Sequence, residues 1–222
     1  MTAARHYSEA LGELKEMVLR MGGLAERMVD CAINALVERN AGLMDEVRAM
    51  ENQVNRLHVD IDEVCLETIA LRQPAAGDLR FITAAMKINT DLERIGDQAT
   101  NISQRAASLL AVPPLKPLID IPRMAQIADG MLKNALDAFV HGDEAMAMET
   151  IALDDEVDQL KDQVFRELLT YMMSDPTTIP RAMDLILVSR SLERIADHAT
   201  NICEDVVFMV KGKDVRHQGP LA

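Results

Sequence analysis

One segment of the sequence occurs twice. "LERIGDQATNI" at residues 92–102 returns at residues 192–202 as "LERIADHATNI", and the two copies differ only where Gly96 and Gln98 are replaced by Ala196 and His198. Self-similarity at a long fixed period is typical of folds assembled from repeated structural units. The chain is therefore predicted to contain two units of the same kind, each carrying one copy.

The residues around both copies favour helices. Aromatic residues make up 3% of the chain, Trp is absent, and 49% of residues are hydrophobic, which is sufficient for a sizeable core. The abundant Ala, Leu, Met, Glu, Asp and Arg are mostly good helix formers or helix-surface residues. No window alternates β-branched residues between Asn-Gly-type turns. We predict an all-α protein.

Turn signals divide each half into three helices. Asn40 with Gly42, and Gln73 with Pro74, end the first two helices, and "VPPLKPLIDIP" with its four prolines follows a third that reaches about Ala111. The second half repeats the plan, with one helix to His141, a second continuous helix from Asp143 to about Met173, and a third ending near Gly212. We expect a first three-helix unit at 1–111, a linker at 112–121 and a second unit at 122–222.

The repeated segment places acidic and amide side chains on one stripe of its helix. At about 100° per residue, Glu93, Asp97 and Asn101 gather on one side, nearly opposite the apolar stripe that begins at Leu92. Like charges four residues apart weaken a helix by a few tenths of a kcal/mol. A chain that contains this arrangement twice calls for a functional explanation, and the second copy supplies Glu193, Asp197 and Asn201.

Further oxygen ligands come from the preceding helix of each unit. "ENQVNRL" at 51–57 aligns with "DDEVDQL" at 154–160, so that Glu51 and Asn55 correspond to Asp154 and Asp158. If neighbouring helices bring these side chains beside the repeated segment, each unit gains a crowded oxygen cluster that suits magnesium, manganese, calcium or iron. The predicted metal ligands are Glu51, Asn55, Glu93, Asp97 and Asn101 in the first unit, and Asp154, Asp158, Glu193, Asp197 and Asn201 in the second. Solvated acidic faces that bind no metal remain the alternative.

Three other positions carry specific expectations. Arg94 and Arg194 point about 100° away from the preceding carboxylate and are expected to bridge to acids of other helices. His198, which the first copy lacks, is interpreted as a surface residue rather than a metal ligand. Arg80, in "RQPAAGDLR", is expected to contact a partner or to form an ion pair between the two bundles.

Composition disfavours several classes of function. The formal net charge is -13, and no Lys/Arg cluster is interleaved with aromatics, so nucleic acid is not an expected partner. No apolar run approaches the roughly 20 residues of a membrane helix, and no signal peptide is recognisable, which predicts a cytoplasmic protein. A di-iron oxidase would carry Glu-x-x-His pairs, and no His here has a Glu three residues before it.

Six segments together resemble the PhoU family of phosphate-uptake regulators. They are "MGGLAE", "ALRQPAAGDLR", "DLERIGD", "YMMSDPTTIP", "LERIADHATNICE" and "VKGKDVRH", in order along nearly the whole chain. The resemblance implies two tandem three-helix bundles related by pseudo-twofold symmetry. It also implies (E/D)xxxD motifs, which in some members hold iron or zinc clusters. Asn55, at the Asp position of that motif, leaves the first unit one charge short.

The same resemblance implies a function without a catalytic step. Such proteins repress the phosphate-starvation response and are thought to link the ATPase-bearing phosphate ABC transporter to a sensor histidine kinase. They often form homodimers and reach the inner face of the membrane through those partners. Iron, zinc, manganese and magnesium are therefore the expected metals, and a metal-free helical scaffold that docks basic patches of partners is the competing hypothesis.

Overall fold

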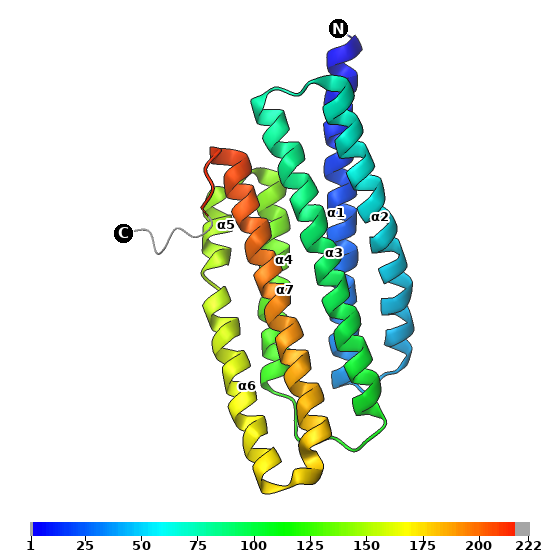
Figure 1. The fold of residues 1–222 in the computed structure, drawn as a ribbon, viewed down its shortest axis with the longest axis vertical. Helices are drawn as coiled ribbons and strands as arrows, with labels where there is room; N and C mark the ends of the chain where they lie inside the picture. Colours follow the sequence, from blue (N-terminus) through cyan, green and yellow to red (C-terminus); the bar gives the residue numbers. More distant parts are fainter. Residues whose placement is uncertain (1, 216–222) are drawn as a thin grey trace, which may run out of the picture.

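The computed structural model describes residues 2–215, with side chains for residues 9–71 and 73–215. Its helices are α1 (Thr2–Val37), α2 (Gly42–Arg72), α3 (Ala76–Leu110), α4 (Asp120–His141), α5 (Glu144–Ile151), α6 (Asp154–Ser174) and α7 (Ile179–Lys211), with a 3-10 turn η1 (Pro176–Thr178) before α7 (Figure 1). Residues 2–215 contain no strand, which confirms the all-α prediction. Arg216 and His217 of "VKGKDVRH", and the predicted end of the second unit at 222, lie outside the described residues.

Local sequence explains the helix ends. Gly142 and Gly212 adopt left-handed φ values of 62° and 67°, and their N–H groups donate to carbonyls of the preceding helix. Gln73 adopts the same region, with φ 46°, directly before Pro74. The Asp143 carboxylate accepts from the Met146 N–H and caps α5 as expected.

The predicted continuous helix from Asp143 to Met173 is wrong, because the chain breaks at residues 152–153. Leu153 N–H bonds to the Thr150 carbonyl, and a new helix starts at Asp154. The break places Asp154, Asp155 and Glu156 in the first turn of α6. Carboxylates are favoured there by the free N–H groups and the helix dipole, whereas a continuous helix would hold three adjacent acids in its middle.

The two repeats pack along α3 and α7, which run side by side in opposite directions (Figure 1). Arg80 donates to the Met209 carbonyl at 3.2 Å near one end, and the Arg105 guanidinium lies 3.4 Å from the Asp184 carboxylate near the other. Helix α1 packs on α4 across the same junction. This antiparallel pairing relates the repeated segments by a pseudo-twofold axis between α3 and α7.

A buried apolar core runs through both repeats. Each copy of the repeated segment contributes its predicted apolar stripe: Leu92, Ile95, Ala99 and Ile102, and likewise Leu192, Ile195, Ala199 and Ile202, are all fully buried. The stripes therefore fix the rotation of α3 and α7 about their axes. None of the helices in the described part of the chain is long and apolar enough to span a membrane.

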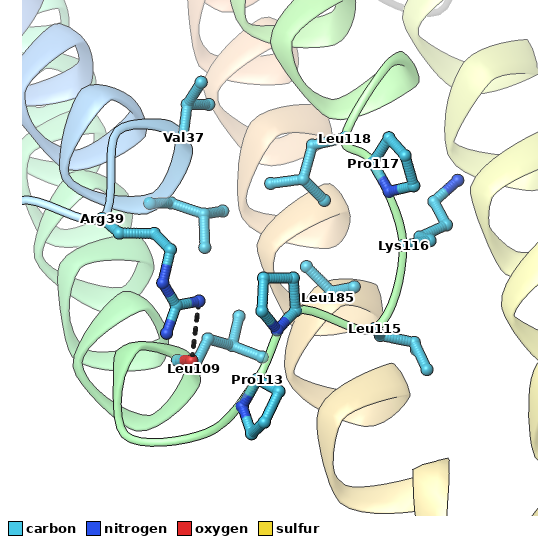
Figure 2. Close-up of a pocket in the computed structure, with 11 residues that line it drawn as sticks. Val37, Arg39, Leu109, Pro113, Leu115, Lys116, Pro117, Leu118 and Leu185 are labelled. Carbon is cyan, nitrogen blue, oxygen red and sulfur yellow. Dashed lines mark hydrogen bonds between the residues drawn. The ribbon is translucent and has the colours of Figure 1, made fainter.

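The segment between α3 and α4 closes one end of the repeat junction. Arg39, at φ 55°, donates to the carbonyl of Leu109 (Figure 2). It also donates to the carbonyls of Leu110 and Val112 and so holds the end of α3. Arg39 also lines a cavity of about 310 Å³, together with residues that include Leu36, Leu115 and Leu185. The last residues of the predicted 112–121 linker are already helical, since α4 starts at Asp120.

Candidate functional site

In the second repeat, acids of α6 and α7 are brought together. Lys161 of α6 binds both helices, with its Nζ 2.8 Å from Asp158 Oδ1 and 3.0 Å from Glu193 Oε1. These two hydrogen bonds, that to Asp158 first, raise the pKa of Lys161. Lys161 was not among the predicted site residues, although it follows Asp158 by three residues and so shares its helix face.

Two carboxyl groups of this cluster, those of Asp154 and Asp197, have raised pKa values because they are partly buried and lie near other carboxylates. Burial raises the pKa of Asp154 to about 6, and the carboxylates of Asp197, Asp158, Asp155 and Glu193 add to the rise. Burial also raises the pKa of Asp197, with Glu193 and Asp158 contributing, while His198 and Lys161 oppose the rise. The four predicted carboxylates of the second set therefore lie within mutual electrostatic reach, and Lys161 balances only part of their charge.

In the first repeat the corresponding acids meet an arginine of their own helix. Arg94 Nε lies 3.5 Å from Glu93 Oε2, and Arg94 Nη1 lies 3.3 Å from Asp97 Oδ2. The expectation that Arg94 bridges to another helix is therefore wrong, because its flexible stem turns back to the two adjacent carboxylates. Glu51 is half-buried and Asn55 is exposed on α2.

Helices α2 and α3 approach closely at the level of this first set. A Cβ built on Gly96 would lie 3.4 Å from Val54 Cγ1, and these two residues sit between the predicted ligands of their respective helices. The aligned position to Lys161 in the first repeat is His58, whose Nδ1 is buried without a hydrogen-bond partner. The two repeats therefore share their helix placement and differ in how their acids are balanced.

The oxygen sets suit a cation in composition but are not preassembled around one. Within the described residues, no group of three His, Cys, Asp or Glu side chains is arranged to hold a metal ion. In the second repeat the Lys161 ammonium lies where a cation would bridge Asp158 and Glu193. The ammonium and a metal ion would compete for the same two carboxylates, so a metal ion there would require the lysine side chain to move away.

The predicted amide ligands lie toward the other repeat. Asn201 Nδ2 donates to Asp91 Oδ1 at 3.2 Å, and His198 Nδ1 lies 2.8 Å from the same oxygen. His198 is thus a half-buried contact between repeats and not the surface residue that we expected. Asn101 lines a groove between α3 and α7. Asp91 was missed because the second copy has Ser191 at that position, which left no repeat signal.

Arg80 makes a contact between the bundles, though not an ion pair. Its Nε donates to the Met209 carbonyl, and its stem packs on Gly212 at the end of α7. A guanidinium near the last carbonyls of a helix is favourable because it meets the negative end of the helix dipole. This contact accounts for Arg80 structurally, so its predicted binding of a partner stays a prediction.

A family model described as "PhoU domain" matches this chain twice, over residues 18–106 and 121–206. The chain belongs to the PhoU family. Each match covers one repeat, and the PhoU architecture of two tandem three-helix bundles is the one described above, with the third bundle helix of each repeat, α3 and α7, at the junction.

Relatives from distant bacteria cover nearly all of the PhoU-family chain. A protein of Pseudomonas putida named "Phosphate-specific transport system accessory protein PhoU homolog" is 41% identical over 97% of this chain and 85% of its own length. A homologue of the same name from Aquifex aeolicus is 44% identical over 94% of each chain.

Solved PhoU structures share the fold. The crystal structure of PhoU from Pseudomonas aeruginosa has a TM-score of 0.90 at 39% identity, and it covers 93% of this chain and 100% of that one. The phosphate transport system regulatory protein PhoU from Streptococcus pneumoniae has a TM-score of 0.86 at 26% identity, covering 94% and 99%. The fold of this chain is therefore shared with PhoU proteins of two different bacteria.

Proposed function

We propose that this protein regulates phosphate transport as an accessory protein and represses the phosphate-starvation response. In this role it would link the ATPase subunit of the phosphate ABC transporter to a sensor histidine kinase. Support comes from family membership over both repeats and from the names of the relatives, which are accessory to phosphate-specific transport. The role needs no catalytic step. The protein would work in the cytoplasm as a homodimer and reach the inner membrane through these partners.

Metal binding by the acidic sets is the second part of the proposal. The observation that carries it is the convergence of acids from α6 and α7 around Lys161 Nζ, which lies 2.8 Å from Asp158 and 3.0 Å from Glu193. Repulsion from neighbouring carboxylates adds to the effect of burial in raising the pKa of Asp154 to about 6. Iron, zinc, manganese or magnesium would relieve that repulsion. Asp154 and Asp158 would hold the ion from α6, Glu193 and Asp197 from α7, and the bound charge would fasten the two helices together.

A metal-free scaffold is the competing function, and one observation favours it. Lys161 and Arg94 already neutralise acids in the second and first repeat, respectively. In that case the acidic faces dock basic patches of partner proteins directly, as complementary charge increases association rates and specificity.

Metal binding can be measured on protein purified without chelator or polyhistidine tag and then titrated with Mn²⁺. We expect Glu193→Ala/Asp197→Ala to weaken Mn²⁺ binding at least about tenfold, because two carboxylate ligands are lost. Affinity in the parent protein should also fall as the pH drops through about 6, since protons then compete for Asp154.

The matched control is Glu63→Ala/Glu67→Ala, which removes an exposed acidic pair four residues apart on α2. It loses the same charge and should leave Mn²⁺ affinity unchanged. Equal, near-zero metal content in the parent and the Glu193→Ala/Asp197→Ala variant would favour the scaffold.

The regulatory role is tested by deleting the gene. Transcription of phosphate-starvation genes should then rise in phosphate-rich medium, and the intact gene supplied in trans should restore repression. The Glu193→Ala/Asp197→Ala variant should fail to restore it if the acidic face carries the signal. Unchanged repression after deletion would exclude this role.

A further inference from the structure

The junction of α3 and α7 contains a polar groove separate from the acidic sets. It consists of two adjoining hollows of about 200 and 530 Å³, which share Gln98 and Arg194 in their walls. Ser191 lines the smaller hollow together with Gln98, and this pair is the pseudo-twofold counterpart of the contact between Asp91 and His198. The groove therefore follows from the symmetry of the repeat junction.

Four arginines from the two repeats line this groove. Arg94 and Arg194, the arginines of the two repeated segments, both border the larger hollow, and Arg105 and Arg190 border the smaller one with Arg194. Their gathering is unexpected in a chain of net charge -13. Each repeated segment contributes one of these arginines, Arg94 or Arg194. The antiparallel pairing of α3 and α7 therefore brings two of the four arginines together.

The charges of these arginines are balanced unequally. Arg94 is held by Glu93 and Asp97, and Arg105 by Asp184. Arg190 and Arg194 form no hydrogen bond or ion pair with any other described residue. They are four residues apart on α7, so that two uncompensated positive charges lie on one helix face, which destabilises the helix.

Few carboxylates are available to neutralise the arginines of the groove. Asp91 accepts from Asn201 and contacts His198. Asp197 is the one acid among the residues that line the two hollows, and it borders only the larger one. The surplus in the smaller hollow, between Arg105, Arg190 and Arg194, is therefore positive.

Unused hydrogen-bond donors accompany the two arginines. The side chains of Gln98 and Asn101 make no hydrogen bond to another described residue, although Gln98 is 7% exposed. Thr200 lines the larger hollow, and its Oγ1 is buried without a partner. Guanidinium groups offer donors only, so a ligand that satisfies this set must be rich in acceptors.

We propose that the groove between α3 and α7 binds a tetrahedral oxyanion of the phosphate class, held by Arg190 and Arg194 and by the donors of Gln98 and Asn101. The guanidinium fork matches phosphate oxygens in pairs, and an anion removes the repulsion between the two arginines. Free inorganic phosphate and a phosphoryl group on a larger molecule share this chemistry. The site does not depend on the proposed metal clusters or protein partners.

The test is calorimetric titration of the full-length protein with inorganic phosphate, in EDTA, at low ionic strength and neutral pH. We expect saturable binding by the parent protein and a dissociation constant at least about tenfold higher in Arg190→Gln/Arg194→Gln, since two charge-assisted contacts are lost. EDTA removes metal ions, so phosphate bound through a metal does not contribute to the signal. A negative result would therefore count against the groove alone, and the proposed metal binding and regulatory role would be judged by their own experiments.

The matched control is Arg48→Gln/Arg166→Gln, which removes two exposed arginines that have no side-chain partner among the described residues. This control should bind phosphate as the parent does, with all melting temperatures measured to confirm folding. Titrations with sulfate and phosphoserine identify the source, because tighter binding of phosphoserine assigns the groove to a phosphoryl group on a partner. No saturable binding of any of the three anions, or equal weakening in both variants, would overturn the proposal.

Discussion

Replacing Gly22 by leucine is expected to lower the free energy of unfolding by about 3 kcal/mol, the upper part of the range for overpacked cores. Gly22 is buried where α1 of the first repeat meets α4 of the second. A Cβ at this position would lie 2.5 Å from Leu136 Cδ1 and 2.9 Å from Cδ2. Leu136 is itself buried, with 5% exposure, so a larger side chain at position 22 must displace this leucine or push the two repeats apart.

The neighbouring glycine provides the control. A Cβ on Gly23 would meet nothing within 4 Å, so Gly23→Leu should be neutral or stabilise by up to about 1 kcal/mol through helix propensity. Urea unfolding of both variants measures the difference. In a double-mutant cycle, Gly22→Leu and Leu136→Ala should cost less together than the sum of their separate effects. Additive costs would show that the two positions do not press on each other.

Patterns within one helix were sufficient to predict most of the fold. The apolar stripe around Leu92 and the breakers at Pro74 and Gly142 act through local backbone geometry, so their consequences are readable from neighbouring residues. The break between α5 and α6 was missed because Ala152 and Leu153 carry no breaking signal. It depends instead on where three acids are best placed at a helix start.

The candidate site was predictable only for residues at matching positions of the two repeats. Duplication of Glu93 and Asp97 as Glu193 and Asp197 drew attention to the acids. The balancing cations had no such signal, since Lys161 aligns with His58. The groove was also not predicted, because a sequence repeat does not reveal that the two copies face each other across an antiparallel junction.

The junction also contains an ion pair whose loss should be costly. Lys87 Nζ lies 2.9 Å from Asp205 Oδ1, and the Asp205 side chain is 5% exposed. Lys87→Met removes a cationic partner of a nearly buried carboxylate, and we expect it to lower the free energy of unfolding by about 3 kcal/mol. Lys87 belongs to α3 and Asp205 to α7, so the substitution removes a contact between the repeats. Urea unfolding should therefore show a lower free energy of unfolding for Lys87→Met.

An exposed ion pair with a similar N–O distance is the control that separates the effect of burial from the loss of a charge. Lys211 Nζ lies 2.8 Å from Glu144 Oε2, but these side chains are 53% and 36% exposed, so Lys211→Met should cost below about 1 kcal/mol. If both methionine variants lost equal stability, burial of Asp205 would not be the cause. If Lys87→Met alone is strongly destabilising, the low exposure of the Asp205 carboxylate accounts for the difference between the two pairs.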